Sequence, residues 1–271
     1  MLTPTAEAQQ ARGLFPRGLL QPEGGFRFGA DALLLARFAA PVPGARVLDL
    51  GTGCGPVGLG LLLLAHADEE RRVHGLDKDP DMVTAAKANA ARLGLADRFV
   101  ATCCDVRDLR AHPGIVPPES VDLVLANPPY RPPHSGRRPD SPGRDAARFE
   151  TDGGLAAFAA AAAFALTNKG YFACVHLAER LTHITMQLCA NKLEIKTILP
   201  VSPRRDAPAR QVLVLARKNG RPGLRLEAPL ALYEGEGPDT HLTAQALRYC
   251  PFLTCNAGPR ACGGGQEPQS A

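Results

Sequence analysis

Residues 46–58 read RVLDLGTGCGPVG. The first five residues, three of which are aliphatic, are typical of a short buried strand. The glycines that follow allow a tight turn and let a ligand approach the main chain closely. An apolar run at Leu59–His66 then predicts a helix. A strand, a glycine-rich turn and a helix in this order are typical of the first unit of an α/β cofactor-binding fold.

The same alternation of strands and helices continues outward from this stretch. Further strands are expected at Arg72–Leu76, Arg98–Cys104, Val121–Ala126, Tyr171–Leu177, Leu193–Leu199 and Gln211–Ala216. Helices are expected from about Asp31, which we take as a capping residue, and at Pro80–Leu93, Leu155–Leu166 and Ala178–Asn191. This order predicts a doubly wound α/β fold with a seven-stranded, mostly parallel, Rossmann-like sheet. The last two strands lack a helix between them, so they should form an antiparallel hairpin at the sheet edge.

Length and composition limit the possible organisation of the chain. Its 271 residues suffice for one large domain, and without Trp the core must be mainly aliphatic. We expect an irregular N-terminal arm at 1–23, the main domain at 24–233 and a partly disordered extension at 234–271.

Several features of the sequence predict a cytoplasmic protein. The start lacks a signal-peptide pattern, and no apolar run could span a bilayer. The eight cysteines are then expected to be reduced. The spacing of Cys250, Cys255 and Cys262 does not fit a zinc site, so no metal is expected. A net charge of +4 does not by itself indicate a nucleic-acid partner.

Special residues follow four of the predicted strands. Gly51, Asp77, Asp105 and Asn127 each come at or just after a strand end. Because right-handed crossovers bring the carboxyl ends of parallel strands to one edge, these residues should lie together where such sheets bind ligands.

The glycine-rich turn predicts a cofactor loop made by Gly51, Gly53 and Gly55. The segment also matches the dinucleotide fingerprint, so a dinucleotide-dependent oxidoreductase remains an alternative. Asp49 favours S-adenosylmethionine instead, because a carboxylate repels a pyrophosphate and attracts the cationic methionine part.

The acids at the next strand ends have expected roles in holding this cofactor. Asp77 can accept hydrogen bonds from both ribose hydroxyls. Asp105 can accept one from the adenine amino group, although it could instead only stabilise the turn that follows it. Asp79 precedes Pro80 and is interpreted as a helix cap.

Asn127, Pro128, Pro129 and Tyr130 predict the chemistry. The lone pair of an exocyclic amine is delocalised into its ring, so such a nitrogen is a poor nucleophile. The Asn127 amide oxygen and the Pro128 carbonyl could accept its hydrogens and free that lone pair. Pro129 stiffens the loop, and Tyr130 could stack on a target ring. Asn127 is expected to border both the cofactor and the target.

The set DLGTGCG, Asp77, Asp105 and NPPY resembles the amino-methylating class I S-adenosylmethionine-dependent methyltransferases. With GFRFGADALLLA at 24–35, the resemblance narrows to bacterial tRNA (adenine-N6)-methyltransferases that act beside the anticodon of a valine tRNA, and it covers about Gly24 to Leu247. It implies transfer of a methyl group to adenine N6, with Phe28 and Asp31 near the methionine end of the cofactor. Because protein glutamine methyltransferases also carry NPPY, they remain an alternative, as does methylation of another RNA base.

Arginine-rich segments flank the expected site. Arg131, Arg137 and Arg138 follow the NPPY loop, and Arg204 and Arg205 lie between the last two strands. Arginines around a base pocket suit a phosphate backbone, which favours tRNA as the partner over a merely solvated surface.

Overall fold

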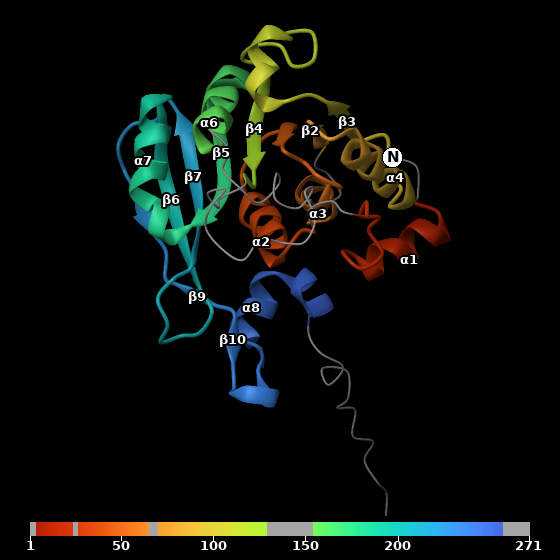
Figure 1. Ribbon diagram of the computed structural model, residues 1–271, viewed down its shortest axis with the longest axis vertical. Helices are drawn as coiled ribbons and strands as arrows, with labels where there is room; N and C mark the ends of the chain where they lie inside the picture. The colour runs from red at the N-terminus through yellow and green to blue at the C-terminus, as the bar shows by residue number, and fades with distance from the viewer. Residues whose placement is uncertain (1–3, 24–26, 65–69, 129–153, 257–271) are drawn as a thin grey trace, which may run out of the picture.

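The central sheet divides the molecule into two helical layers (Figure 1). The computed structural model describes residues 4–23, 27–64, 70–128 and 154–256. The strands of this sheet are β1 (Arg46–Leu50), β2 (Arg72–Asp77), β3 (Phe99–Cys103), β4 (Val121–Ala126), β5 (Leu166–Leu177), β6 (Leu193–Ser202), β7 (Gln211–Lys218), β8 (Arg225–Leu226) and β9 (Leu230–Ala231).

The strand order is β3-β2-β1-β4-β5-β7-β6-β8, with β9 also paired to β6. Strands β1 to β5 pair in parallel, whereas β7 is antiparallel to both of its neighbours, β5 and β6. The predicted seven-stranded, mostly parallel sheet with an edge hairpin is therefore confirmed, and the short β8 and β9 extend it. The strand order reverses between β1 and β4, which is where ligands bind in open α/β sheets.

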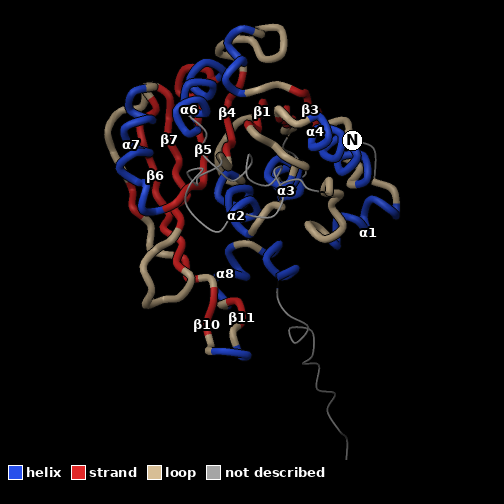
Figure 2. The backbone as a smooth tube through the Cα atoms, viewed as in Figure 1, coloured by secondary structure: helices blue, strands red, loops and turns tan. Residues whose placement is uncertain are grey.

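Helices cover both faces of the sheet (Figure 2). The α-helices are α1 (Ala6–Leu14), α2 (Ala30–Ala39), α3 (Pro56–Leu64), α4 (Pro80–Arg92), α6 (Gly154–Ala165), α7 (Leu181–Ala190) and α8 (Ala244–Tyr249). The 3-10 helices are η1 (Val106–Ala111), η2 (Ala178–Arg180), η3 (Gly237–Asp239) and η4 (Pro251–Asn256). None of the helices in the described ranges has the length and apolarity needed to cross a membrane.

Two apolar cores result from the alternation of side chains along the strands. Val47 of β1 packs in the core formed with α2, α3 and α4, and its neighbour Leu48 packs in the core formed with α6 and α7. In the same way, Leu125 of β4 packs in the first of these cores and Ala126 packs in the second. Burial on both faces explains why these strands are almost entirely aliphatic.

The N-terminal arm is not irregular as expected, because residues 6–14 form α1. The Thr5 side chain caps this helix by accepting a hydrogen bond from the Ala8 nitrogen. Its buried face consists of Ala8 and Ala11, and two small residues give only a weak periodic signal. The Arg12 guanidinium ties α1 to the end of α4 by donating to the Leu93 carbonyl at 2.8 Å.

The segment after β9 also contains more structure than its sequence pattern suggests. β10 (Tyr233–Glu234) and β11 (His241–Leu242) form a separate small hairpin, and α8 and η4 follow it. Thr243 caps α8, while Cys250 and Leu253 pack in the core that contains α2. Residues 257–271, the last part of the extension expected to be partly disordered, lie outside the described residues.

Candidate active site

The four strand-end residues are brought to one edge of the sheet. Leu50 pairs with Leu76 on one side and with Ala126 on the other. Gly51 and Asn127 come directly after the paired Leu50 and Ala126, so the strand spacing of about 4.8 Å places them side by side. Asp77 pairs with Cys103, and Asp105 follows two residues later. The glycine loop, the three polar strand ends and the reversal of strand order thus coincide.

The loop after β1 is held in a conformation that glycine favours. Gly51, Gly53 and Gly55 have φ angles of 67°, 56° and 92°, in a region that other residues seldom adopt. The Thr52 nitrogen donates to the Leu76 carbonyl at 2.8 Å, and the Gly53 nitrogen donates to Asp77 Oδ2 at 2.8 Å. The loop is therefore shaped by β2 before any ligand is bound.

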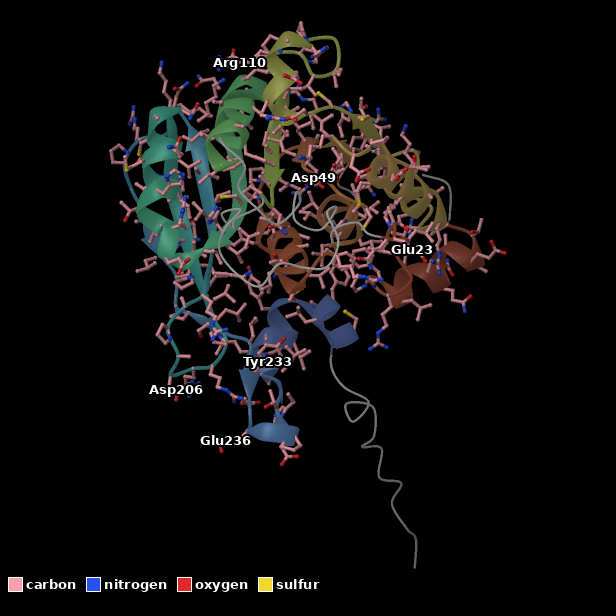
Figure 3. All side chains as sticks on the ribbon, in the orientation of Figure 1. Glu23, Asp49, Arg110, Asp206, Tyr233 and Glu236 are labelled. Atoms are coloured by element: carbon pink, nitrogen blue, oxygen red, sulfur yellow. The ribbon has the colours of Figure 1, made fainter. Side chains whose placement is uncertain are left out.

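Asp49 stabilises the loop from below. It is 1% exposed and lies near the middle of the molecule (Figure 3). Its Oδ2 accepts hydrogen bonds from Thr52 Oγ1 at 2.7 Å and from the Gly58 nitrogen at 3.1 Å. Burial, helped by the nearby charge of Asp77, raises the pKa of Asp49 to about 7, although the two hydrogen bonds act to lower it. A cation bound above the loop would favour the ionised form.

We expect the pKa of Asp49 to make the stability of the protein depend on pH. Folding raises the pKa of Asp49 from 3.8 to about 7, so the folded protein binds the carboxyl proton more tightly than the unfolded chain does. The contribution of this proton to the free energy of unfolding is complete below about pH 4 and is lost as the pH rises through 7. Asp49→Asn does not titrate, so between about pH 5 and pH 7 it should gain about 2 kcal/mol in free energy of unfolding relative to the wild type. Urea denaturation at several pH values measures this gain. The exposed Asp81→Asn is the control, and equal pH profiles for Asp49→Asn and wild type would contradict the assignment.

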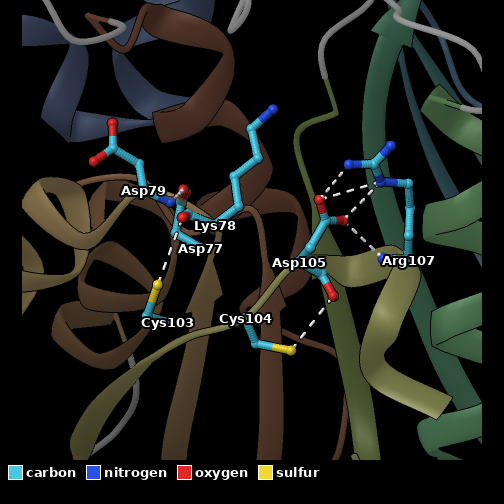
Figure 4. A network of polar contacts seen from close by, with 7 residues as sticks. All are labelled: Asp77, Lys78, Asp79, Cys103, Cys104, Asp105 and Arg107. Carbon is cyan, nitrogen blue, oxygen red and sulfur yellow. Dashed lines mark hydrogen bonds and ion pairs between the residues drawn. The ribbon is translucent and has the colours of Figure 1, made fainter. Parts of the chain in front are cut away.

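Asp77 and Asp79 have different contacts despite their proximity (Figure 4). Asp77 accepts from the Gly53 nitrogen and, through Oδ1, from the Asp79 nitrogen at 3.0 Å. Burial raises the pKa of Asp77. Asp79 caps α4 by accepting from the nitrogens of Asp81 and Met82, which confirms the interpretation of Asp79 as a cap. A carboxylate offers about four acceptor positions, so Asp77 retains room for two ribose hydroxyls.

Asp105 forms an ion pair with Arg107, a contact that the sequence did not predict. Arg107 donates to both of its oxygens, with one contact of 2.6 Å from Nη2 to Oδ2 (Figure 4). The Arg107 nitrogen also donates to Oδ1, so Asp105 closes the turn into η1. The guanidinium holds the pKa of Asp105 below its usual range. Contact with an adenine amino group remains a prediction, and such a group would have to share these oxygens with Arg107.

Asn127 and Asp31 meet across the site. The Asn127 Nδ2 donates to Asp31 Oδ2 at 3.3 Å. Within the described residues the Asn127 Oδ1 is buried and accepts no hydrogen bond. Asp31 does not cap α2 as expected, because Gly29 occupies that position and Asp31 lies in the first turn. Pro128 is buried, whereas Pro129 and Tyr130 lie outside the described residues.

Phe28 and Asn89 connect the segment before α2 to the glycine loop after β1. Phe28 packs against Cys54, Met82 and Ala85. The fully buried Asn89 of α4 accepts from the Leu20 nitrogen at 2.7 Å and donates to the carbonyls of Leu20 at 3.0 Å and Cys54 at 2.9 Å. Asn89 was not predicted to matter. The sequence feature that could have indicated its role is its position: Asn89 is a polar residue among the apolar residues on the buried face of α4.

Removing Asn89 should therefore disturb both folding and the loop. Asn89→Ala removes the partner of three backbone groups, of which the Cys54 contact is buried and the two Leu20 contacts are partly buried, and we expect the free energy of unfolding to fall by about 1–3 kcal/mol. Affinity for the cofactor should fall with it because the Cys54 carbonyl is no longer held. Urea denaturation and calorimetry measure the two effects. Lys87→Ala, at an exposed position of the same helix, is the matched control, and unaltered stability would contradict the bridging role.

The predicted arginines are only partly within the described structure. Arg131, Arg137 and Arg138 lie outside it. The loop of Arg204 and Arg205 follows β6, which runs in the same direction as β5 because both pair antiparallel to β7. This loop therefore leaves the sheet at the edge that carries Asn127. Arg204 donates to the Gly235 carbonyl and to Thr240 Oγ1. Arg205 is exposed, as is Asp206, the next residue in the chain, which is labelled in Figure 3.

Comparison with known proteins agrees with this geometry. The family described as methyltransferase domain matches residues 41–201. A tRNA1(Val) (adenine(37)-N6)-methyltransferase of Citrobacter koseri is 34% identical over 57% of this chain and 59% of its own length, so the chain spans about three fifths of that relative. The protein of the same name from Porphyromonas gingivalis is 30% identical over 66% of this chain and 72% of its own length.

Solved structures share the fold. A structure described as a predicted O-methyltransferase from Agrobacterium tumefaciens has a TM-score of 0.63 and 20% identity, and the match covers 82% of this chain and 96% of that one. An S-adenosylmethionine-dependent O-methyltransferase from Thermotoga maritima has a TM-score of 0.50 and 15% identity, and covers 82% of this chain and 74% of that one. At these identities the likeness shows the fold alone.

Proposed function

The chain belongs to the methyltransferase domain family, and from that premise we propose that it transfers a methyl group from S-adenosylmethionine to adenine N6 in a tRNA. The observation that carries the proposal is the buried amide oxygen of Asn127, which accepts no hydrogen bond within the described residues. It lies beside the glycine loop, at the reversal of strand order. A buried acceptor without a donor is costly, so a donor from the substrate is favoured there.

The residues around the loop fit S-adenosylmethionine. An added Cβ on Gly53 would meet no atom within 4 Å, which leaves space for a ligand against the loop. Asp49 lies beneath the loop and Asp77 beside it, a pair of acids that suits a cation and repels a pyrophosphate. The dinucleotide alternative is therefore disfavoured by the site as well as by the family. Asp77 would hold the ribose, and Asp49 would favour the positive charge of the methionine part.

The proposed chemistry needs positioning and an acceptor. S-adenosylmethionine supplies a methyl group on a sulfonium sulfur, which is a good leaving group. Asn127 Oδ1 would accept a hydrogen bond from the exocyclic amine, which draws the nitrogen lone pair out of the ring toward the methyl group. The bond from nitrogen to the methyl carbon would form as the bond from sulfur to that carbon breaks. S-adenosylhomocysteine would then leave, and the methylated nitrogen would lose one proton to water. The Pro128 carbonyl is proposed to accept the second hydrogen, and Tyr130 to stack on the base. Such preorganised acceptors act most strongly where water is excluded.

The choice of tRNA adenine rests on the relatives and on charge. Both named relatives act on adenine 37 of a valine tRNA according to their names. The arginine-bearing loop after β6 leaves the sheet at the edge that carries Asn127, where it could contact a phosphate backbone. A glutamine side chain offers the same amide chemistry to NPPY, so a protein substrate is the second candidate.

One labelling experiment separates these two substrates. The protein is incubated with methyl-labelled S-adenosylmethionine and either unmodified tRNA or total bacterial protein, and the labelled fraction is digested and analysed. We expect N6-methyladenosine in tRNA. Label only in glutamine of protein would overturn the substrate, and no label in either fraction, from a protein that binds the cofactor, would overturn the activity.

The loop after β6 gives a separate prediction for RNA affinity. Arg205→Gln should weaken tRNA binding and reduce the slope of log K against log salt by about 1, because one phosphate contact is lost. Electrophoretic shifts at several salt concentrations measure this slope. Arg221→Gln is the control, since Arg221 is also exposed but follows β7 at the opposite edge. Equal slopes for Arg205→Gln and wild type would show that Arg205 is a solvated surface residue that makes no contact with RNA phosphates.

A further inference from the structure

We propose that Asp31 is a positioning residue that fixes the orientation of the Asn127 amide, so that its oxygen faces the target amine. This inference rests on the proposed function and goes beyond the expected nearness of Asp31 to the methionine part of the cofactor. The two residues come from distant parts of the chain, the first turn of α2 and the end of β4. Their contact is a hydrogen bond of 3.3 Å from Asn127 Nδ2 to Asp31 Oδ2.

The direction of this hydrogen bond follows from chemistry. An ionised carboxylate can only accept hydrogen bonds, and of the two ends of an amide only the nitrogen can donate. Asn127 must therefore turn its nitrogen toward Asp31, which leaves Oδ1 on the other side. Without Asp31 the amide could rotate by half a turn and offer its NH₂ group to the substrate, and two facing amino groups cannot form the required hydrogen bond.

The position of Asp31 is itself well fixed. Its side chain is 5% exposed, and its second oxygen, Oδ1, accepts from the Ala32 nitrogen at 3.0 Å. The residues that follow it in α2, Leu33 to Ala36, are almost entirely buried in the core. A rotation of the Asp31 carboxylate would break the hydrogen bond from the Ala32 nitrogen. Because α2 is packed in the core, Asp31 therefore holds Asn127 in a fixed position. A functional group held on such an element keeps its geometry better than one on a loop.

The carboxylate also strengthens the acceptor. A hydrogen bond from the amide nitrogen to an anion polarises the amide and increases the negative charge on its oxygen, since linked hydrogen bonds reinforce one another. The more negative oxygen attracts the amine hydrogen more strongly, which leaves more electron density on the target nitrogen and makes it a better nucleophile. Asp31 therefore acts through Asn127 on the transition state, and its loss should appear in kcat more than in the affinity for the cofactor.

A double-mutant cycle tests this role. Asp31→Ala, Asn127→Ala and the double variant are compared with wild type for single-turnover methyl transfer at saturating cofactor, for cofactor affinity by calorimetry and for Tm. Asp31→Ala should lower the transfer rate about tenfold or more with cofactor affinity within threefold. In the Asn127→Ala background the same change should cost less than twofold, because there is no amide left to orient. The exposed Glu7→Gln, which removes a first-turn carboxylate from α1, is the control.

Asp31→Asn separates positioning from simple packing. The amide oxygen of the new side chain can still accept a hydrogen bond from Asn127 Nδ2. We therefore expect Asp31→Asn to keep most of the methyl-transfer rate that Asp31→Ala loses. If Asp31→Ala does not fold, the Asp31→Asn variant still tests the proposal. Full multiplication of the two losses in the double variant would overturn the inference, as would a large loss of cofactor affinity at an unchanged transfer rate. Either result leaves the proposed function standing, which instead fails if Asn127→Ala alone transfers methyl groups normally.

Discussion

Asn127→Ala should lower kcat by two or more orders of magnitude while the affinity for S-adenosylmethionine stays nearly unchanged. The amide oxygen is proposed to bind the target amine most strongly in the transition state, when the nitrogen lone pair is leaving the ring. Loss of one such acceptor costs about 10²–10³ in rate. The cofactor loop keeps its contacts in this variant, since Gly53 and Thr52 are held by β2 and by Asp49. Single-turnover kinetics and calorimetry on the same preparation measure both quantities.

A structural role for Asn127 predicts a different set of results. If the residue only closed a turn after β4, its loss would lower Tm and cofactor affinity together, and turnover would fall in proportion to the folded fraction. Asn191→Ala is a suitable control, because this amide also follows a regular element and donates to a carbonyl, that of Gln187, away from the site. A folded, cofactor-binding Asn127→Ala protein with normal turnover would refute the mechanism.

The edge on which the site lies could be predicted from the sequence because topology alone determines it. Aliphatic strands alternating with helices require a parallel sheet, and right-handed crossovers bring the ends of such strands together. The positions of the predicted strands therefore sufficed to predict that Gly51, Asp77 and Asn127 lie at the same edge of the sheet. The cap at Asp79 was also predictable, since the Asp-Pro pair acts locally on the first turn of its own helix.

Contacts between distant segments could not be predicted in the same way. The hydrogen bonds of Asn89 to Leu20 and Cys54 join residues up to 69 positions apart, and no local pattern encodes them. The ion pair of Arg107 with Asp105 depends on a side-chain rotamer at an exposed turn. Helices α1 and α8 are stabilised by a few buried residues, such as Ala8, Ala11 and Ala246, and tertiary packing rather than periodicity selects such short helices.

Asp77→Ala should weaken S-adenosylhomocysteine and S-adenosylmethionine binding by about 1.5–3 kcal/mol, or roughly 10–150-fold in Kd. Asp77 accepts two backbone hydrogen bonds, from Gly53 and Asp79, and its remaining acceptor positions are proposed to take the ribose hydroxyls. Burial that raises the pKa of Asp77 makes its charge costly in the free protein, so each hydroxyl that donates to it relieves part of that cost. Calorimetry on the folded variant measures the loss.

Because Asp77 also holds the Gly53 nitrogen, the ribose contact has to be separated from support of the loop. An S-adenosylhomocysteine analogue without the two ribose hydroxyls should bind the wild type more weakly than the parent compound, yet bind Asp77→Ala and wild type with similar affinity. The neighbouring Asp79→Ala removes only the cap of α4; it should cost about 1 kcal/mol of stability with cofactor affinity within twofold. If the analogue loses as much affinity as the parent compound when Asp77 is replaced, Asp77 shapes the loop and the ribose must be held by another group.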